Sequence, residues 1–280
     1  MPTDPAERHP CAALRGEDFR RACGLAAVEV LAETGSTMER ARAVALDPLA
    51  RLPLAVIADR QTAGRGRRGA GWWQAPGSLA VSLVVEGSAL VPRGGGVTPL
   101  WSLACGVALA ESLAALEPAL EPRLRWPNDV VSRGRKLAGI LVETAPGARA
   151  IFGVGVNTTG SAADAPPPLR DRVGTLPDLV GRALARETLL ADFVPRLLSL
   201  LGETGRDPGV LVERYRPRCD LAGDEVTVHR EDGRRLVGVC HGIDADGALV
   251  LDTPAGLVHL VSGSLTDPRD VWRERPDGAD

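Results

Sequence analysis

The sequence predicts an α+β protein, with a large mixed-sheet domain followed by a small β-rich domain. Two observations carry this prediction. After residue 27, short apolar runs of strand length alternate with longer runs of helical composition. From Gly223 onward, short strand-like runs are separated by Asp-Gly and Ala-Gly pairs at near-regular spacing, which is typical of a small β-barrel. We therefore expect an N-terminal extension (1–27), a large domain (28–218), a small barrel (219–270) and a tail (271–280).

Strands and helices in the first half of the large domain follow from runs of apolar residues. Glu17–Cys23 is expected to form a short helix or to belong to a frayed tail. Ser36-Thr37 stands directly before a helical run, which is a helix N-cap signal. A polar, glycine-rich loop separates the last two strands. The expected elements are strands at Ala27–Ala32, Leu54–Ala58 and Leu79–Val85, and a helix at Met38–Ala45.

The second half begins with a long apolar helix, Leu100–Leu116, closed by Pro118. Two strands flanking a turn at Pro146-Gly147 are expected to pair with each other. Prolines 166–168 indicate a loop, and an amphipathic helix follows. The two strands are Leu137–Val142 and Ala150–Val156, and the amphipathic helix is Glu187–Leu201.

The β-rich tail is divided by hairpin signals. Asp-Gly pairs favour tight hairpins, in which both central positions adopt positive φ. The expected strands are Glu225–His229, Arg235–Cys240, Ala248–Leu251 and Val258–Val261, with turns at Asp232-Gly233, Asp246-Gly247 and Ala255-Gly256.

Composition excludes several classes of protein. The chain has 280 residues, of which 44% are hydrophobic and 25% charged, as expected for a globular protein with a sizeable core. A net charge of -3 argues against a general binder of nucleic acid or acidic membranes. Five scattered cysteines without a C-x-x-C pair indicate reduced thiols. With no signal peptide visible and no apolar run near membrane-span length, we expect a soluble, cytoplasmic protein.

The loop Gln61–Trp72 has the strongest chemical signature. Its alternating glycines allow the backbone to approach a ligand closely, and Arg65, Arg67 and Arg68 supply fixed charge for phosphates or carboxylates. It matches neither the dinucleotide-binding nor the P-loop pattern. The alternatives are a solvated basic loop or an RNA-binding Arg-Gly segment, although such segments are usually repeated. An anion-binding active-site loop is favoured.

A second group of polar residues is the turn Arg125-Trp126-Pro127-Asn128-Asp129, followed by Lys136. The turn has two readings: Asx side chains that bond their own backbone, or oxygen ligands for a magnesium ion on a nucleotide. A hairpin would return Lys136 beside it. Lys136 is the only lysine among 33 lysine and arginine residues. An ammonium is a compact point charge, whereas a guanidinium is a wide planar fork, but an isolated lysine is also consistent with compositional bias.

Five motifs in order resemble those of biotin protein ligases. They cover residues 30 to 160, and their combination is far more specific than any one of them. They are Ser36-Thr37, Gln61 to Gly69 as Q-x-x-G-R-G-R-R-G, Arg125 to Asp129 as [K/R]-W-P-N-D, Lys136 to Gly139 as K-L-A-G, and Gly153 to Asn157 as G-x-G-[IV]-N. The resemblance implies a catalytic domain like those of class II aminoacyl-tRNA synthetases and lipoate ligases, followed by an SH3-like domain.

The resemblance also implies a reaction. Biotin and Mg-ATP give biotinyl-5'-AMP and pyrophosphate, and biotin then passes to a lysine of a biotin carboxyl carrier protein or domain. The implied catalytic residues are Lys136, Arg65, Arg67 and Asp129. Biotin would be bound by Ser36, Thr37, Gln61, Arg65, Gly66, Arg67, Lys136, Gly139 and Gly155. ATP would be bound by Arg65, Arg67, Arg68, Trp72, Asn128, Lys136 and Asn157, with Asp129 and Asn128 as magnesium ligands.

This sequence departs from the family pattern at Met38, where asparagine is common, at Arg125, where lysine is common, and at Ala70, where arginine is common. Two rivals stay open: a lipoate protein ligase, and a sensor that binds biotin or nucleotide without transferring it. Only 35 residues precede Ser36, which predicts an enzyme without the DNA-binding module of some relatives. Homodimerisation is left open.

Overall fold

The large domain is built on a seven-stranded mixed sheet. The computed structural model describes residues 13–87, 99–230 and 232–266. The strands lie in the order β1-β2-β3-β7-β6-β5-β4; β1 and β2 are parallel and all other neighbours are antiparallel. Their bounds are β1 (Ala27–Thr34), β2 (Leu54–Gln61), β3 (Leu79–Glu86), β4 (Arg123–Arg125), β5 (Asp129–Ser132), β6 (Arg135–Ala145) and β7 (Arg149–Val156).

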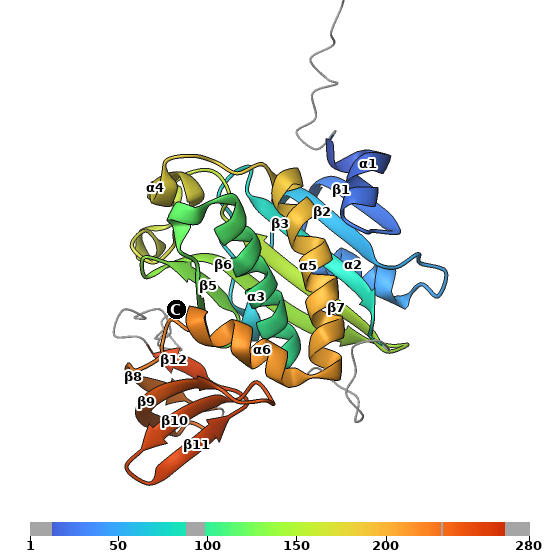
Figure 1. Cartoon of the computed structure of the whole chain (residues 1–280). Coiled ribbons are helices and arrows are strands. Elements are labelled where there is room, and N and C mark those ends of the chain that lie inside the picture. Colours follow the sequence, from blue (N-terminus) through green and yellow to red (C-terminus); the bar gives the residue numbers. More distant parts are fainter. Residues whose placement is uncertain (1–12, 88–98, 231, 267–280) are drawn as a thin grey trace, which may run out of the picture.

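Helices cover the two faces of this sheet unequally (Figure 1). The long helices α3 (Pro99–Leu116) and α5 (Arg186–Arg206) pack together on one face and enclose the main core, with α6 (Pro208–Tyr215) beside them. On the other face, α2 (Thr37–Leu46) covers a smaller apolar cluster and leaves part of the sheet for a site. Within the described residues, the remaining helices are α1 (Glu17–Ala22), α4 (Leu176–Val180) and six 3-10 turns: Ala13–Arg15, Arg67–Gly69, Pro118–Leu120, Ala162–Asp164, Pro167–Leu169 and Arg216–Arg218.

Each helix and strand expected from the sequence is present, with shifted ends. The pairing of β6 with β7 is confirmed, and β6 runs three residues beyond its expected end, to Ala145. The short strand β5 and the helices α4 and α6 were not expected, because four to eight residues are too few to show a periodic pattern. Ser36 occupies the N-cap position of α2 but makes no side-chain cap; Gln61 Oε1 accepts the Thr37 amide instead, at 2.9 Å.

The apolar helix α3 corrects one expectation. It is long and apolar enough to cross a membrane by length and composition, contrary to the expectation that no such run exists. However, 67% of it is buried between the sheet, α5 and α6. A helix that is buried on several sides needs apolar residues around its whole circumference. Thus α3 is the core helix of the large domain.

The small domain is a five-stranded antiparallel sheet in the order β11-β10-β9-β8-β12. Its strands are β8 (Glu225–His229), β9 (Arg235–Ile243), β10 (Leu249–Thr253), β11 (Gly256–Leu260) and the unexpected β12 (Ser264–Thr266). The expected positive φ at both turn positions was wrong. Gly233 and Gly247 adopt it, but Asp232 and Asp246 do not, because their turns are closed by bonds from backbone amides to the Asp232 and Asp244 carboxylates.

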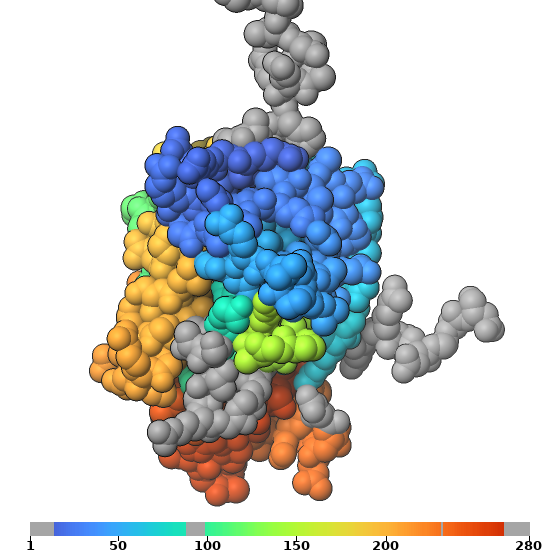
Figure 2. Space-filling view, turned by 90° about the vertical axis from the view of Figure 1, so that its right-hand side faces the viewer, coloured from blue at the N-terminus to red at the C-terminus, as the bar shows by residue number. Residues whose placement is uncertain are grey.

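The two domains are packed directly against each other, with the orange-to-red C-terminal residues beneath the large domain in the space-filling view (Figure 2). Trp126 Nε1 donates to Gly247 O at 3.2 Å. Gly247 has φ 77°, and a Cβ there would lie 3.0 Å from Leu103 of α3. Only glycine fits this contact, so the β9–β10 turn docks on the start of α3.

Candidate active site

The open face of the sheet carries a trough of small residues beside α2. Ala80, Gly155, Gly139 and Asp129 are paired in register across β3, β7, β6 and β5. A Cβ on Gly155 would lie 2.5 Å from Trp72 Cε2, and one on Gly139 would lie 3.0 Å from Trp72 Cζ3. The indole therefore lies directly on the two glycines, and its buried Nε1 has no hydrogen-bond partner among the described residues. The indole thus fills the trough above the two glycines.

Lys136 lies at the end of this trough, as the hairpin predicts. Its Nζ is 2.7 Å from Asp129 Oδ1 and 5.6 Å from the centre of the Trp72 ring. The main chain of Lys136 is fixed on the side away from β5, because its amide donates to Arg172 O at 2.7 Å and its carbonyl accepts from Gly174 N at 2.8 Å. The ammonium is thus held between a carboxylate and an aromatic face while a third of the side chain is exposed.

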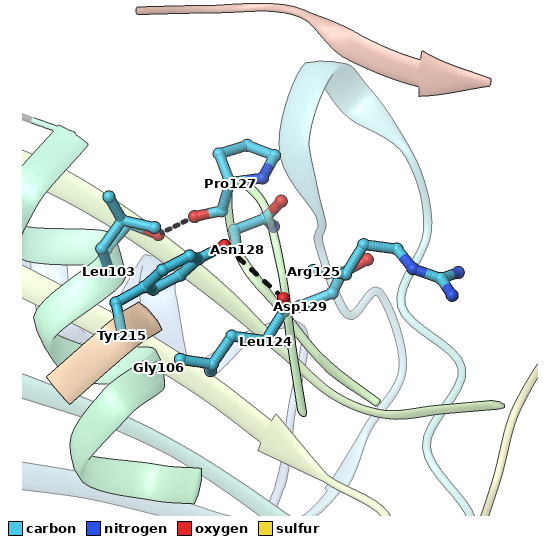
Figure 3. Close-up of a pocket in the computed structure, with 9 residues that line it drawn as sticks. Leu103, Gly106, Leu124, Arg125, Pro127, Asn128, Asp129 and Tyr215 are labelled. Carbon is cyan, nitrogen blue, oxygen red and sulfur yellow. Dashed lines mark hydrogen bonds between the residues drawn. The ribbon is translucent and has the colours of Figure 1, made fainter. Parts of the chain in front are cut away.

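The turn that supplies Asp129 is fastened from several directions. Asn128 Nδ2 donates to Ile140 O at 2.8 Å, and Ser102 of α3 donates to Pro127 O at 3.1 Å. Arg67 donates to Asn128 Oδ1 at 3.3 Å. Figure 3 shows a small pocket behind the turn, with Tyr215 reaching in from α6. The structure shows neither local reading of the turn: Asn128 bonds the backbone of β6 rather than that of its own turn, and Asp129 faces Lys136.

A chain of hydrogen bonds forms the opposite end of the trough. Ser82 Oγ donates to Thr37 Oγ1 at 2.8 Å, and Thr37 Oγ1 donates to Gln61 Oε1 at 3.2 Å. The Gln61 Nε2 amide has no acceptor among the described residues and is the free donor at the end of this chain. Ser36 is buried beside it. Ser82 was missed from the sequence, although a single polar residue inside the apolar run Leu79–Val85 is a usable signal.

The arginines of the glycine loop point in three directions. Arg67 reaches Asn128. Arg65 is half exposed, with Glu39 3.9 Å away. Arg68, at φ 54°, donates to Ser264 Oγ of β12. The loop itself is closed by Gly66 N donating to Ala70 O at 2.7 Å and Trp72 N to Gly64 O at 2.9 Å. Among the three arginines, the structure brings Arg67 to the Asn128-Asp129 turn.

Asn157 serves the backbone around the trough. It is buried, its Nδ2 donates to Gly174 O at 3.2 Å, and its Oδ1 accepts from Ala75 N at 3.4 Å. These bonds tie the segment that holds Lys136 to the segment that follows Trp72. The side chain therefore supports two parts of the site at once.

The residues that depart from the family pattern have defined partners. Arg125 forms an ion pair with Asp220 at 2.6 Å, in the segment that leads to the small domain. Met38 lies over β7, where a Cβ on Gly153 would be 2.5 Å from its sulfur. Ala70 accepts the Gly66 hydrogen bond through its backbone, which any side chain allows.

The carboxylates do not form a ready metal centre. Within the described residues, no group of three or more histidine, cysteine, aspartate and glutamate side chains could hold a metal ion. Asp129 is paired with Lys136, and both ends of the Asn128 amide are bonded to protein. The described site therefore does not fit a magnesium ion held by the protein alone.

Comparisons with known proteins agree with this geometry. Residues 35–157 match the biotin/lipoate A/B protein ligase family, and residues 222–264 match the biotin protein ligase C terminal domain. A biotin--[acetyl-CoA-carboxylase] ligase from Mycobacterium tuberculosis is 33% identical over 91% of this chain and 94% of its own length. One from Paracoccus denitrificans is 34% identical over 81% of this chain and 95% of its own.

The fold is similar to that of a biotin protein ligase from Aquifex aeolicus solved with biotin and ATP. The TM-score is 0.72 at 25% identity, covering 86% of this chain and 98% of that one. Fold and site together define a protein ligase of the biotin and lipoate class. The second domain and the curated relatives narrow the class: the chain belongs to the biotin protein ligases.

Proposed function

We propose that the trough between Gln61 and Lys136 is where this ligase joins biotin to AMP. The protein is an enzyme that activates biotin with ATP and transfers it to a carboxylase. The observation that carries the assignment of the site is the chain's only lysine, fixed by Asp129 at the end of a glycine-floored trough.

Biotin lies with its ureido ring at the Gln61 end and its carboxylate at the Lys136 end. The Gln61 amide donates to the ureido oxygen, and Ser36 and Thr37 line the same end. Gly139 and Gly155 let the ring system lie on the strands, provided that Trp72 moves off them and covers the ligand. A donor aimed at the ureido oxygen disfavours analogues that lack this group, because it would then be left without a partner.

The first half-reaction brings two anions together. A biotin carboxylate oxygen attacks the α-phosphorus of ATP, a new P–O bond forms, and pyrophosphate leaves. Lys136 lies against the carboxylate and the phosphate, and lowers the cost of bringing them together. In the second half-reaction a lysine amine of the carrier attacks the acyl carbon, and AMP leaves.

The glycine loop supplies the remaining charge. Arg67 is already at the Asn128-Asp129 turn and needs only to exchange Asn128 for the adenylate phosphate. Arg65 and Gly66 approach the biotin carboxylate as the loop closes, and Arg68 and Trp72 border the nucleotide, whereas Asn157 keeps its bonds to the backbone. Loop closure excludes water from the mixed anhydride, which protects it from hydrolysis.

Magnesium enters this proposal with ATP, as the counter-ion of its phosphates. Magnesium sites commonly combine one or two carboxylates with substrate phosphates, and Asp129 is the carboxylate in position. Asp129 must then be shared with Lys136, and Asn128 would keep its structural role.

The acceptor is a lysine on a biotin carboxyl carrier protein or domain, and the enzyme acts in the cytoplasm without binding operator DNA. The net charge of -3 supports the absence of DNA binding. The oligomeric state, including a homodimer through the sheet, is to be measured beside DNA binding. Sedimentation of the protein with and without biotin, and a mobility-shift assay with DNA, test these two points.

The central experiment mixes the protein, biotin, Mg-ATP and a carrier domain. We expect pyrophosphate release and a streptavidin-reactive carrier, both dependent on biotin. Tight biotin binding without pyrophosphate would mean a sensor, and incorporation of lipoate but not biotin would mean a lipoate ligase. Either result would contradict the proposal.

A further inference from the structure

A buried serine on β3 begins the hydrogen-bond chain at the Gln61 end of the trough. Ser82 pairs in register with Val56 of β2 and with Gly153 of β7, and none of its surface is exposed. Its hydroxyl donates to Thr37 Oγ1 at 2.8 Å. Because Ser82 is fully buried, it does not contact a ligand in the trough itself. Any effect that it has on a ligand must pass through Thr37.

The hydroxyl of Thr37 is oriented by Ser82. A hydroxyl has one hydrogen to donate and lone pairs that accept. Because Ser82 donates to Thr37 Oγ1, Thr37 keeps its own hydrogen for Gln61 Oε1, 3.2 Å away. The backbone amide of Thr37 donates to the same oxygen at 2.9 Å. The Gln61 oxygen therefore accepts two hydrogen bonds from the first residue of α2.

Two donors on one oxygen fix both the end and the tilt of the Gln61 amide. The Thr37 N–H disfavours the flipped amide, because two donors would then face each other. The Thr37 hydroxyl adds a second direction and so restricts rotation of the amide. Gln61 Nε2 lies beside the glycine loop: a Cβ on Gly64 would be 3.2 Å from Nε2 and 3.4 Å from Trp72 Cβ. The amide thus presents an N–H donor on the side where Trp72 fills the trough.

We propose that Ser82 is a positioning residue that sets the polarity of the ureido site, by aiming the Gln61 N–H at a ligand oxygen through Thr37. The inference rests on the proposed function, since it takes the ureido end of biotin to lie against Gln61. Each member of the chain donates toward the ligand, and hydrogen bonds aligned in this way polarise one another. The site therefore selects a cyclic urea, whose oxygen accepts, over a cyclic guanidine, which presents N–H donors in that place.

The test compares biotin with 2-iminobiotin, the cyclic guanidine with the same ring system and carboxylate tail. Ser82→Ala removes the first donor of the chain. In the folded full-length protein, the dissociation constant for biotin, measured by calorimetry, should rise by about threefold to tenfold, the range for one hydrogen bond. The dissociation constant for 2-iminobiotin, measured by competition, should change little, because this ligand does not use the donor. The preference for biotin therefore falls.

Steady-state kinetics provide a second readout. Ser82 is remote from the reacting carboxylate, so Ser82→Ala should raise the KM for biotin in pyrophosphate release and leave kcat near the wild-type value. A fall in kcat with an unchanged KM would contradict a role in positioning the ureido site.

Ser132→Ala is the matched control. Ser132 is also fully buried in a strand of the same sheet, but its hydroxyl donates to Leu120 O and is not part of the chain. Both dissociation constants should stay near those of the wild type. A loss of biotin affinity in Ser82→Ala no larger than that in Ser132→Ala would overturn the inference and leave the proposed function standing. If the wild type does not bind biotin, the proposed function fails, and this inference fails with it.

A double-mutant cycle tests whether Ser82 acts through Thr37. Thr37→Val removes the hydroxyl at nearly constant volume and so interrupts the chain between Ser82 and Gln61. Adding Ser82→Ala to Thr37→Val should then weaken biotin binding no further, with thermal melting used to confirm that each variant is folded. Additive losses of biotin affinity would mean that Ser82 acts by packing, and would overturn the inference.

Discussion

At the scale of single residues, Lys136 is the sharpest test of the site. Lys136→Arg keeps the charge but replaces a point donor with a planar fork, which cannot occupy the space between Asp129 and the Trp72 ring in the same way. Loss of one donor aimed at developing charge costs at least about 100-fold in rate. We expect pyrophosphate release to fall by about that factor, measured in single-turnover assays.

The matched control is Arg135→Lys, the neighbouring position, where the side chain donates to Arg170 O at the surface. Near-normal rates are expected there. If Lys136→Arg were as active as Arg135→Lys, the assignment of Lys136 would fail.

A second residue-scale prediction concerns the trough. Gly155→Ala places a methyl group 2.5 Å from the Trp72 ring, so the indole or the strand must shift. Overpacking of this kind costs about 1–3 kcal/mol, and we expect biotin affinity, measured by calorimetry, to fall by roughly tenfold. Gly71→Ala is the control, because a Cβ at Gly71 meets nothing within 4 Å. Equal biotin affinities in the two variants would show that Gly155 does not shape the pocket.

At the scale of elements, strand β2 contributes to the trough on one face of the sheet and contacts helix α5 on the opposite face. Asp59 of β2 forms a buried ion pair with Arg186 at the start of α5, at 2.7 Å. On the same strand, Arg60 pairs with Glu33 at 3.0 Å in the open. The two pairs have similar lengths and differ mainly in burial, so they compare a buried with an exposed pair on one strand.

We expect Asp59→Ala to lower the free energy of unfolding by about 3–5 kcal/mol, because it leaves the Arg186 charge buried without this carboxylate. Glu33→Ala should cost less than about 1 kcal/mol. Urea denaturation of both variants measures the difference. Similar losses in the two would mean that Arg186 finds another carboxylate or water.

The sequence predicted most helices and strands, but it did not predict which residues cap the helices or connect distant elements. Apolar runs such as Leu54–Ala58 and Leu79–Val85 predicted the strands, because burial on two faces leaves little room for polar residues. By contrast, the cap of α2 comes from Gln61, twenty-four positions away. Propensity rules describe neighbours in the chain, so a cap supplied by another strand cannot be read from them.

At the candidate site, too, the sequence predicted contacts between near neighbours in the chain but not those made by tertiary packing. The ordered motifs identified Lys136 and Asp129, and the hairpin rule predicted that they meet. The partner of Arg68 in β12 was not predictable, since it depends on how one domain docks on the other. Asn157, expected beside the nucleotide, is bonded to backbone on both sides of the trough, which only the packed structure reveals.

At the scale of the whole molecule, the small domain is connected to the glycine loop. Arg68 holds a left-handed conformation at φ 54° while its guanidinium bonds Ser264. A hydrogen bond to a charged group contributes about 1.5–3 kcal/mol, so its loss makes ordering of the loop more costly. Ser264→Ala should therefore weaken binding of the adenylate.

We expect about a tenfold higher dissociation constant for biotinyl-AMP in Ser264→Ala, together with faster proteolysis at the loop. Ser262→Ala, two residues earlier, is the control. Unchanged affinity and proteolysis in Ser264→Ala would mean that the small domain does not help to order the loop.

The pairing of Lys136 with Asp129 beneath Trp72 has a consequence for the enzyme's own surface. An acyl adenylate that escapes a ligase reacts with any nearby primary amine. This chain has no other lysine, and its single ε-amine is occupied in the site. Arginine supplies the rest of its basic surface and stays protonated. The enzyme's side chains are therefore expected to resist self-biotinylation, and free biotinyl-AMP should label lysine-bearing bystander proteins and, on this chain, only an α-amino group.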